Sequence, residues 1–214
     1  MPEFEHWVKR YRLPGNPIFI PEARIEPSPY NALYAYCAAG AFGFCPFGID
    51  SLHPPGDASD PGPAIMQTYT APVSLGDMLP AAQAAGRTRG MVLHANSPRR
   101  AQTVALGGYL FEGSLSRAWS TDTLLANDGA MLLLQSGSDE FLVVGSGLTV
   151  RMSRDPDTDS RVAGIASIEE VTRGAADWIV KFRLNGDQSN QGRQLSMDSH
   201  QVRIYRLRMY SGAR

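Results

Sequence analysis

The stretch NPIFIPEAR, residues 16–24, decides how the first part of the chain is expected to fold. Ile18, Phe19 and Ile20 form a short apolar run that stands between two prolines. A run that is apolar on both faces is typical of a strand buried on both sides, as in a parallel sheet. Glu22 follows directly, so we expect a carboxylate at the carboxyl end of a buried strand.

A helix and a second strand are predicted after this run. The segment SPYNALYAYCAAG, residues 28–40, begins with a proline near a helix start and ends with a glycine, a common helix stop. The apolar segment AFGFCPFGID, residues 41–50, predicts the second strand. Strand, helix and strand with short connections are the repeating unit of a (β/α)₈ barrel. Functional residues of such barrels gather where the strands end, and Glu22 has that position.

Several segments resemble a known enzyme family. GNPIFIPEA, YNALYAY and GFCPFGID are similar to the last part of the catalytic barrel in a bacterial branch of glycoside hydrolase family 35, the β-galactosidase family. The segments DEFLVVGSGLTV, AGIASIEEV, LNGDQSNQGR and YRLRMY resemble the β-rich domain that follows that barrel. The resemblance implies that this chain is the C-terminal portion of a longer enzyme, beginning near the seventh of eight barrel strands.

The spacing of apolar residues changes near residue 90. Helical spacing predicts a helix over residues 2–12, and a further helix is expected over residues 74–85 after a proline-rich surface loop at residues 50–63. Beyond Met91, alternating runs predict short strands at residues 101–106, 109–112, 130–135, 140–144, 148–152, 162–169, 178–184 and 202–210.

This change predicts two domains. Residues 1–90 are expected to be the last βαβα part of a (β/α)₈ barrel. Residues 91–214 are expected to form an antiparallel β-sandwich that is stable alone. Two barrel strands without their neighbours leave edges open, so self-association through these exposed barrel edges is also expected.

Composition limits the classes of partner. The 214 residues are 43% hydrophobic and 19% charged, which is typical of a soluble globular protein. The net charge of −1 argues against nucleic-acid binding, although Arg203, Arg206 and Arg208 form a basic cluster that we interpret as a solvated strand face. No segment has membrane-spanning length and none resembles a signal peptide, so we expect no membrane partner. The sequence leaves the location open between the cytoplasm and, where a longer parent carries a signal, the periplasm.

Neither cysteines nor histidines predict a cofactor site. Cys37 and Cys45 both lie in apolar runs, so we expect buried, reduced thiols that react slowly. The four histidines are scattered without the spacing of metal ligands. We therefore expect no metal and no other cofactor.

Glu22 is the first candidate for a catalytic residue. A retaining glycosidase needs two carboxyl groups about 5 Å apart, one a nucleophile and the other an acid and then a base. By resemblance, Glu22 matches the family nucleophile at the end of the seventh strand. A structural alternative is an ion pair between Glu22 and Arg24.

A second carboxyl group is not evident in the sequence. By resemblance the acid/base belongs to the fourth barrel strand, which this chain does not contain. Glu26 is too close in sequence to Glu22, and Asp50 is better explained as capping a turn. The chain therefore holds half of an active site and is expected to be inactive alone.

Aromatic residues near the strand ends are candidates for sugar binding. Phe47 and Tyr30 are predicted to contact the substrate, a β-galactoside or related carbohydrate, whereas Phe44 is assigned to the core. The resemblance thus predicts part of a retaining β-galactosidase-like hydrolase. The alternative is a non-catalytic module whose β-rich half binds carbohydrate or braces a barrel supplied elsewhere.

Overall fold

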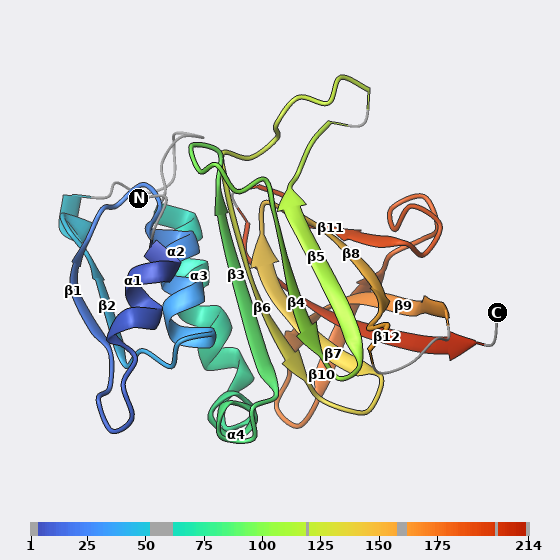
Figure 1. Cartoon of the computed structure of the whole chain (residues 1–214), viewed down its shortest axis with the longest axis horizontal. Helices are drawn as coiled ribbons and strands as arrows, with labels where there is room; N and C mark the ends of the chain where they lie inside the picture. Colours follow the sequence, from blue (N-terminus) through green and yellow to red (C-terminus); the bar gives the residue numbers. More distant parts are fainter. Residues whose placement is uncertain (1–3, 52–61, 119, 158–161, 200, 213–214) are drawn as a thin grey trace.

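Two antiparallel sheets face each other in the second half of the chain (Figure 1). The structure is a computed structural model that describes all residues except 1–3, 52–61, 119, 158–161, 200 and 213–214. The six-stranded sheet has the order β10 (Trp178–Arg183), β9 (Val162–Arg173), β12 (Arg203–Gly212), β7 (Glu140–Ser146), β6 (Asp128–Gln135) and β3 (Thr88–His94). The four-stranded sheet has the order β11 (Gln194–Ser196), β8 (Leu148–Arg154), β5 (Tyr109–Leu115) and β4 (Ala101–Leu106).

A tight hairpin shows how the local sequence fixes one of these pairings. Strands β4 and β5 are joined by Gly107 and Gly108, whose φ angles are 62° and 79°. A two-residue hairpin with positive φ at both central positions matches the right-handed twist of its strands, and glycine adopts that conformation at little cost. The strand predicted at residues 101–106 is present with the predicted bounds.

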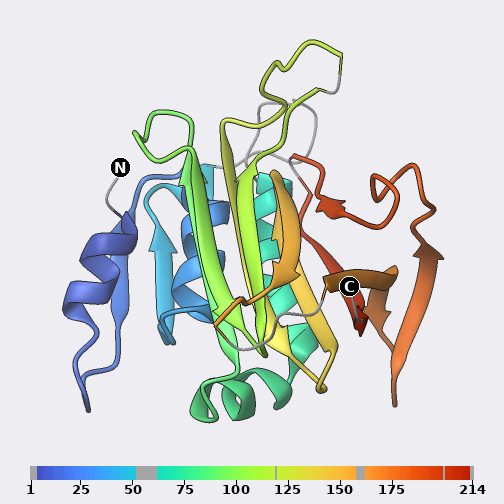
Figure 2. The ribbon, with the colours of Figure 1, turned by 45° about the vertical axis from the view of Figure 1, so that its right-hand side comes forward.

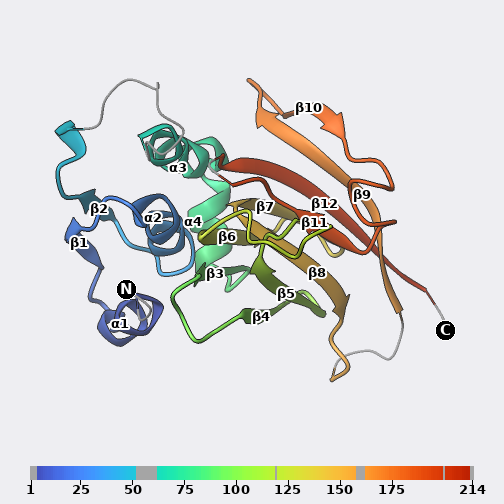
Figure 3. The same ribbon diagram turned by 90° about the horizontal axis from the view of Figure 1, so that it is seen from above.

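The centre of the six-stranded sheet is buried on both faces. In β6, Ala130, Leu132 and Leu134 face one hydrophobic cluster, and Met131 and Leu133 face another. All five side chains are almost completely buried. A continuous apolar run therefore replaces the usual alternation, because the sheet is covered by the four-stranded sheet on one side and by helices on the other (Figure 3).

The helices form the layer on the outer face of the six-stranded sheet. They are α1 (Phe4–Tyr11), α2 (Ser28–Cys37), α3 (Gly62–Leu75) and α4 (Met78–Ala84). Helix α2 packs on β6 and β3, and α3 reaches β9 and β12. One hydrophobic cluster therefore runs from Val8 through these helices to Val171 and Ile204 in the sheet. This cluster crosses residue 90, where the sequence predicts a domain boundary.

The first part of the chain contains one small parallel sheet. Strand β1 (Phe19–Ala23) pairs in parallel with β2 (Gly43–Pro46), and α2 connects them. This pair lies on the side of α2 that faces away from the large sheet (Figure 2, Figure 3). Each strand pairs with no further strand among the described residues.

The prediction that residues 1–90 form the last part of a (β/α)₈ barrel is wrong. A barrel needs a continuous parallel sheet with helices outside it, whereas β1 and β2 form a separate two-stranded sheet. The ten strands from β3 onward pair only antiparallel. The helices bury their apolar faces against the six-stranded sheet, so their packing partner is the β-rich half of the chain.

Strand β1 also differs from the expected strand buried on both sides. The side chain of Phe19 is 49% exposed and that of Ile18, on the helix side, is 7% exposed. Phe19 stacks on Phe42 with ring centroids 5.4 Å apart, and Phe42 is exposed as well. Only one face of the small sheet is therefore buried within the chain.

The segment between the small sheet and the β-rich half contains a helix that the sequence did not predict. Helix α3 includes Pro72 and follows a proline-rich segment that suggested a loop. Most of the predicted loop at residues 50–63 lies outside the described residues. Helix α4 covers the predicted helix at residues 74–85 only in part, because Leu75 still belongs to α3.

The arginines of β12 are paired rather than free. Arg203 contacts Glu170 at 2.7 Å, Arg206 contacts Glu169 at 2.8 Å, and Arg208 contacts Glu140 at 2.9 Å. The acidic partners lie on the two strands that flank β12. The acidic partners thus largely neutralise the basic cluster on this strand face. Among the described residues, no helix is both long and apolar enough to cross a membrane.

The two cysteines have different environments. Cys37 is fully buried in α2, and burial raises the pKa of its thiol well above its ordinary value. Cys45 lies in β2, whose Phe44 and Pro46 face inward, so the Cys45 side chain faces outward and is exposed. The prediction of two buried thiols is therefore wrong for Cys45.

We expect one fast and one slow thiol in a titration with Ellman's reagent without denaturant. Cys45 should react first because it is exposed, and Cys37 should react only on unfolding because its thiolate is disfavoured and inaccessible. Cys45→Ser should remove the fast phase, and Cys37→Ser should leave it unchanged. Slow reaction of both thiols in the native protein would contradict an uncovered outer face of β2.

Candidate functional site

Glu22 lies near the carboxyl end of β1, on an irregular piece of strand. The pairing of β1 with β2 shifts register between Ile20 and Ala23, so Glu22 is in the shifted segment. Its side chain is exposed. In the described part of the chain it forms no ion pair with Arg24, nor with any other residue. The carboxylate is therefore available to a ligand.

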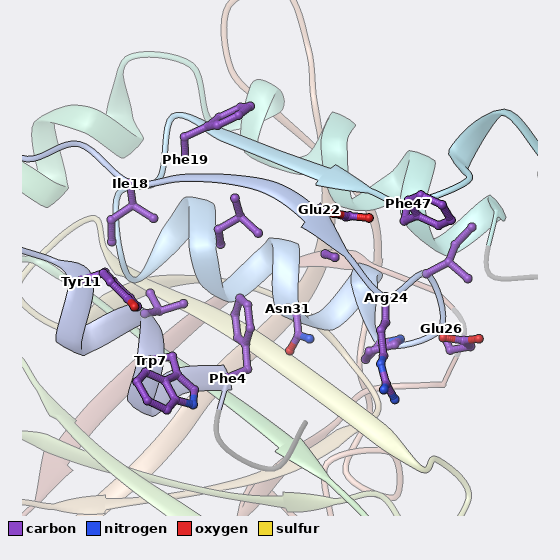
Figure 4. Close-up of a pocket in the computed structure, with 15 residues that line it drawn as sticks. Phe4, Trp7, Tyr11, Ile18, Phe19, Glu22, Arg24, Glu26, Asn31 and Phe47 are labelled. Carbon is purple, nitrogen blue, oxygen red and sulfur yellow. The ribbon is translucent and has the colours of Figure 1, made fainter.

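Phe47 lies next to Glu22 at the end of the neighbouring strand. The backbone N–H of Phe47 donates a hydrogen bond to the carbonyl of Ala23 at 2.8 Å, which holds the two strand ends together. The side chain of Phe47 is 69% exposed, and Figure 4 shows the Glu22 carboxylate pointing toward its ring. An exposed aromatic face beside a carboxylate suits the apolar face of a sugar ring.

Tyr30 and Phe44 have a different position. Both belong to the hydrophobic cluster between the helices and the large sheet, with 8% and 2% of their surfaces exposed. Neither lines the groove that Glu22 and Phe47 share. The structure therefore places Phe47, but not Tyr30, where a ligand at Glu22 would contact it.

A groove of about 730 Å³ runs from Glu22 and Phe47 toward helix α1 (Figure 4). Its far wall is built by Phe4, Trp7 and Tyr11 of α1. Trp7 and Tyr11 are four residues apart on one face of the helix, with ring centroids 6.4 Å apart, and are 41% and 63% exposed. The volume is within the range typical of ligand sites.

The sequence predicts a helix at residues 2–12 but not its role as a wall of the groove. The spacing of Phe4, Trp7, Val8 and Tyr11 predicts an apolar helix face, and that much is correct. Only Val8 is deeply buried, however, so most of the face lies open to the groove. Two large amphipathic aromatics on so short a helix were the available signal.

The end of the groove near Glu22 carries charged side chains of both signs. Arg24 and Glu26 line it together with Glu22, and all three are exposed. Glu26 lies in the turn between β1 and α2, while Asp50 lies in the short 3₁₀ helix η1 (Ile49–Ser51) outside the groove wall. Glu22 and Glu26 thus line the same groove, although Glu26 was expected to lie too close in sequence to Glu22 to act as the second carboxyl group.

Asn31 is the buried polar residue of the groove. It lies in the first half of α2 and is 5% exposed. Its backbone N–H donates to the carbonyl of Pro27 at 3.0 Å. The side-chain oxygen Oδ1 is buried and has no hydrogen-bond partner among the described residues. The sequence predicts that Asn31 lies in the helix at residues 28–40, but it indicates no functional role for this residue.

Helix α1 is held in place by a buried carboxylate. Glu5 is 8% exposed and accepts hydrogen bonds from Arg99 at 2.7 Å and from Gln102 at 3.0 Å. Arg99 and Gln102 belong to the β-rich half of the chain. The aromatic wall of the groove is therefore tied to the sandwich by Glu5 and by Val8 in the core.

Metal-binding and cysteine–histidine sites have little support in the described part of the chain. In the described ranges, no group of three or more histidine, cysteine, aspartate or glutamate side chains is arranged to hold a metal ion. His94 Nδ1 lies 2.5 Å from Asp128 Oδ1, a pairing between adjacent strands that the sequence did not reveal. Cys45 and His53 are a cysteine–histidine pair in the sequence only, without the context of a catalytic thiol, and His53 lies outside the described residues.

Residues 65–196, more than half of the chain, match a family described as a domain of unknown function (DUF5597). The chain belongs to this family. The part that matches the DUF5597 family extends from α3 to β11 and so includes most of both large sheets. Glu22, Phe47 and the wall formed by α1 precede it. No curated protein matches the sequence.

Proposed function

We propose that this chain supplies the nucleophilic carboxylate, Glu22, to a retaining glycoside hydrolase that acts on β-galactosides or related β-glycosides. The observation that carries the proposal is an exposed carboxylate at a strand end, without an ionic partner in the described part of the chain, beside Phe47 and an aromatic groove. The resemblance of the NPIFIPEAR segment to the nucleophile segment of glycoside hydrolase family 35 supports the same assignment.

The geometry suits the first half of a retaining reaction. An ionised Glu22 attacks the anomeric carbon and forms a glycosyl ester, while the bond to the leaving oxygen breaks. That oxygen needs a proton from a second carboxylic acid, which afterwards takes a proton from the attacking water. We propose that this acid belongs to polypeptide outside this chain, because the resembled family supplies it from a segment that this chain lacks.

The experiment uses a longer relative that contains the NPIFIPEAR segment. A 2-deoxy-2-fluoro galactosyl fluoride should accumulate as a covalent ester on the glutamate equivalent to Glu22, since the fluorine slows its hydrolysis. Peptide mass mapping identifies the labelled residue. Glu22→Gln should lower kcat by at least about 10³-fold, because a neutral amide cannot replace a carboxylate nucleophile.

A matched control is available in the same groove. Glu26→Gln removes the same charge from a neighbouring exposed carboxylate, and it should leave the label on Glu22. Residues 1–214 alone should bind methyl β-galactoside without hydrolysing an aryl β-galactoside. A label on another carboxylate, or full activity of Glu22→Gln, would refute the assignment.

A non-catalytic carbohydrate-binding role is the second candidate. The exposed rings of Trp7, Tyr11 and Phe47 favour it, because aromatic faces bind sugar rings whether or not a reaction follows. In that case sugar binding would persist, and neither Glu22→Gln nor Glu26→Gln would change any turnover by a longer relative.

A further inference from the structure

The buried side-chain oxygen of Asn31 has no hydrogen-bond partner among the residues that the structure describes. Buried polar side chains in native proteins are nearly always hydrogen bonded, because an amide loses its bonds to water on burial. Asn31 is 5% exposed, and its Oδ1 has no partner among the described residues.

The position of Asn31 connects this missing partner to the groove. Asn31 lines the same groove as Glu22, and Figure 4 places it between Phe4 and Arg24. A hydrogen-bonding group inside an otherwise apolar part of a site typically fixes the orientation of a ligand. A ligand in the groove would therefore bring the partner that the described residues do not provide.

The amide group also limits the chemistry of that ligand. A neutral amide offers one acceptor and one donor group side by side. Two adjacent hydroxyl groups of a pyranose match this pair, while its apolar ring face fits the rings of Trp7, Tyr11 and Phe47.

We propose that Asn31 recognises a hydroxyl group of a neutral pyranose bound in the groove and thereby contributes to sugar specificity. The inference rests on the proposed function, because it places the sugar beside Glu22. It goes further in naming a specificity residue on α2. A sugar that lacks this hydroxyl leaves the amide without a partner again, so the site discriminates against it.

Binding by residues 1–214 tests the inference without any substitution. Methyl β-galactoside and its monodeoxy analogues are titrated into the isotope-labelled protein, and amide chemical shifts report affinity. One analogue should bind roughly three- to tenfold more weakly than the parent sugar, the loss expected for one hydrogen bond. Equal affinity for all the monodeoxy analogues would overturn the inference.

Substitution then assigns the lost contact to Asn31. Asn31→Leu should bind the parent sugar with the weaker affinity and should no longer distinguish the discriminated analogue. Asn96→Ala changes an exposed asparagine outside the groove and should behave as the unchanged protein. Retention of the original discrimination by Asn31→Leu would refute the role of Asn31.

Stability separates recognition from a structural role. Asn31→Leu removes a buried amide whose Oδ1 has no partner among the described residues, so the thermal unfolding temperature of this variant should equal or exceed that of the unchanged protein. A structural role would instead lower this temperature. Sugar binding in the groove without Asn31-dependent discrimination refutes only this inference. The absence of any sugar-induced shift in the groove refutes the proposed function as well.

Discussion

A chain that begins at Arg87 is expected not to fold, although it contains every strand of both large sheets. The helices that would be lost cover the apolar outer face of the six-stranded sheet over its central strands. The covered side chains are all at most 8% exposed: Val92, Ala130, Leu132, Leu134, Leu142, Val144, Val171 and Ile204. Truncation would expose this apolar face to water.

The burial free energy that truncation removes decides whether the shorter chain folds. Burial of one Val, Leu or Ile side chain contributes about 1.5–3 kcal/mol, so uncovering this face costs at least roughly 10 kcal/mol. The whole free energy of unfolding of a typical domain is about 5–15 kcal/mol. The loss therefore equals or exceeds the stability that is available.

The measurement compares residues 87–214 with residues 1–214. The shorter chain should show poorly dispersed amide resonances, bind a hydrophobic dye and lack a cooperative urea transition. A chain that begins at Asn16 is the control, because it loses α1 but keeps α2, α3 and α4 over the sheet. A cooperatively folded fragment 87–214 would contradict the shared core and support the predicted domain boundary near residue 90.

The sequence predicted local structure better than the partners of each element. The alternation Trp178, Val180 and Phe182 correctly indicates a strand, β10, because side chains on a strand point alternately to opposite faces. The apolar run Ile18–Ile20 indicates a strand equally well, but it does not say what covers each face. The sequence pattern around an apolar residue such as Phe19 is the same whether that side of the strand is buried or exposed.

The error in fold class has the same cause. A strand, a helix and a parallel strand are common to barrels and to many other folds, and the local pattern is identical in each. What differs is the surface on which α2 packs, here β3 and β6, whose residues lie some 50 to 100 positions further along the chain. Such long-range packing leaves no periodic signal in the segment itself.

The sequence predicted residues of the candidate site only where a charged or aromatic residue lies at the end of a strand. Glu22 and Phe47 follow apolar runs, so their exposure near each other could be expected. Asn31 could not be found this way, because an asparagine inside a helix normally has a partner or faces water. Its lack of both becomes visible only once its burial and its neighbours are known.

Substitution of Gly90 is expected to lower the stability of the protein strongly. Gly90 lies in β3 where the end of α2 crosses the sheet. A Cβ atom at this position would overlap the Cβ of Ala38 and lie 3.4 Å from Cδ2 of Tyr34. Glycine is therefore required for the close approach of helix and sheet, and not for an unusual backbone angle.

Gly90→Ala should lower the free energy of unfolding by about 1–3 kcal/mol, and Gly90→Leu by more than about 3 kcal/mol, because overpacked cores relax only by moving backbone. Urea unfolding followed by circular dichroism measures both. Gly186→Ala is the control, since a Cβ there meets no atom within 4 Å. Its effect should stay within about 0.5 kcal/mol.

A second substitution distinguishes this overlap from a general loss of strand or helix propensity. Ala38→Gly removes the very atom that a Cβ at residue 90 would meet, although alone it costs up to about 1 kcal/mol at a helix end. If the overlap is the cause, the double variant Gly90→Ala with Ala38→Gly should be more stable than the sum of the single effects, with a coupling of about 0.5–3 kcal/mol. Strictly additive effects would show that α2 does not pack on β3 at this point. The helical cover of the large sheet, and with it the placement of Asn31 and the groove, would then need revision.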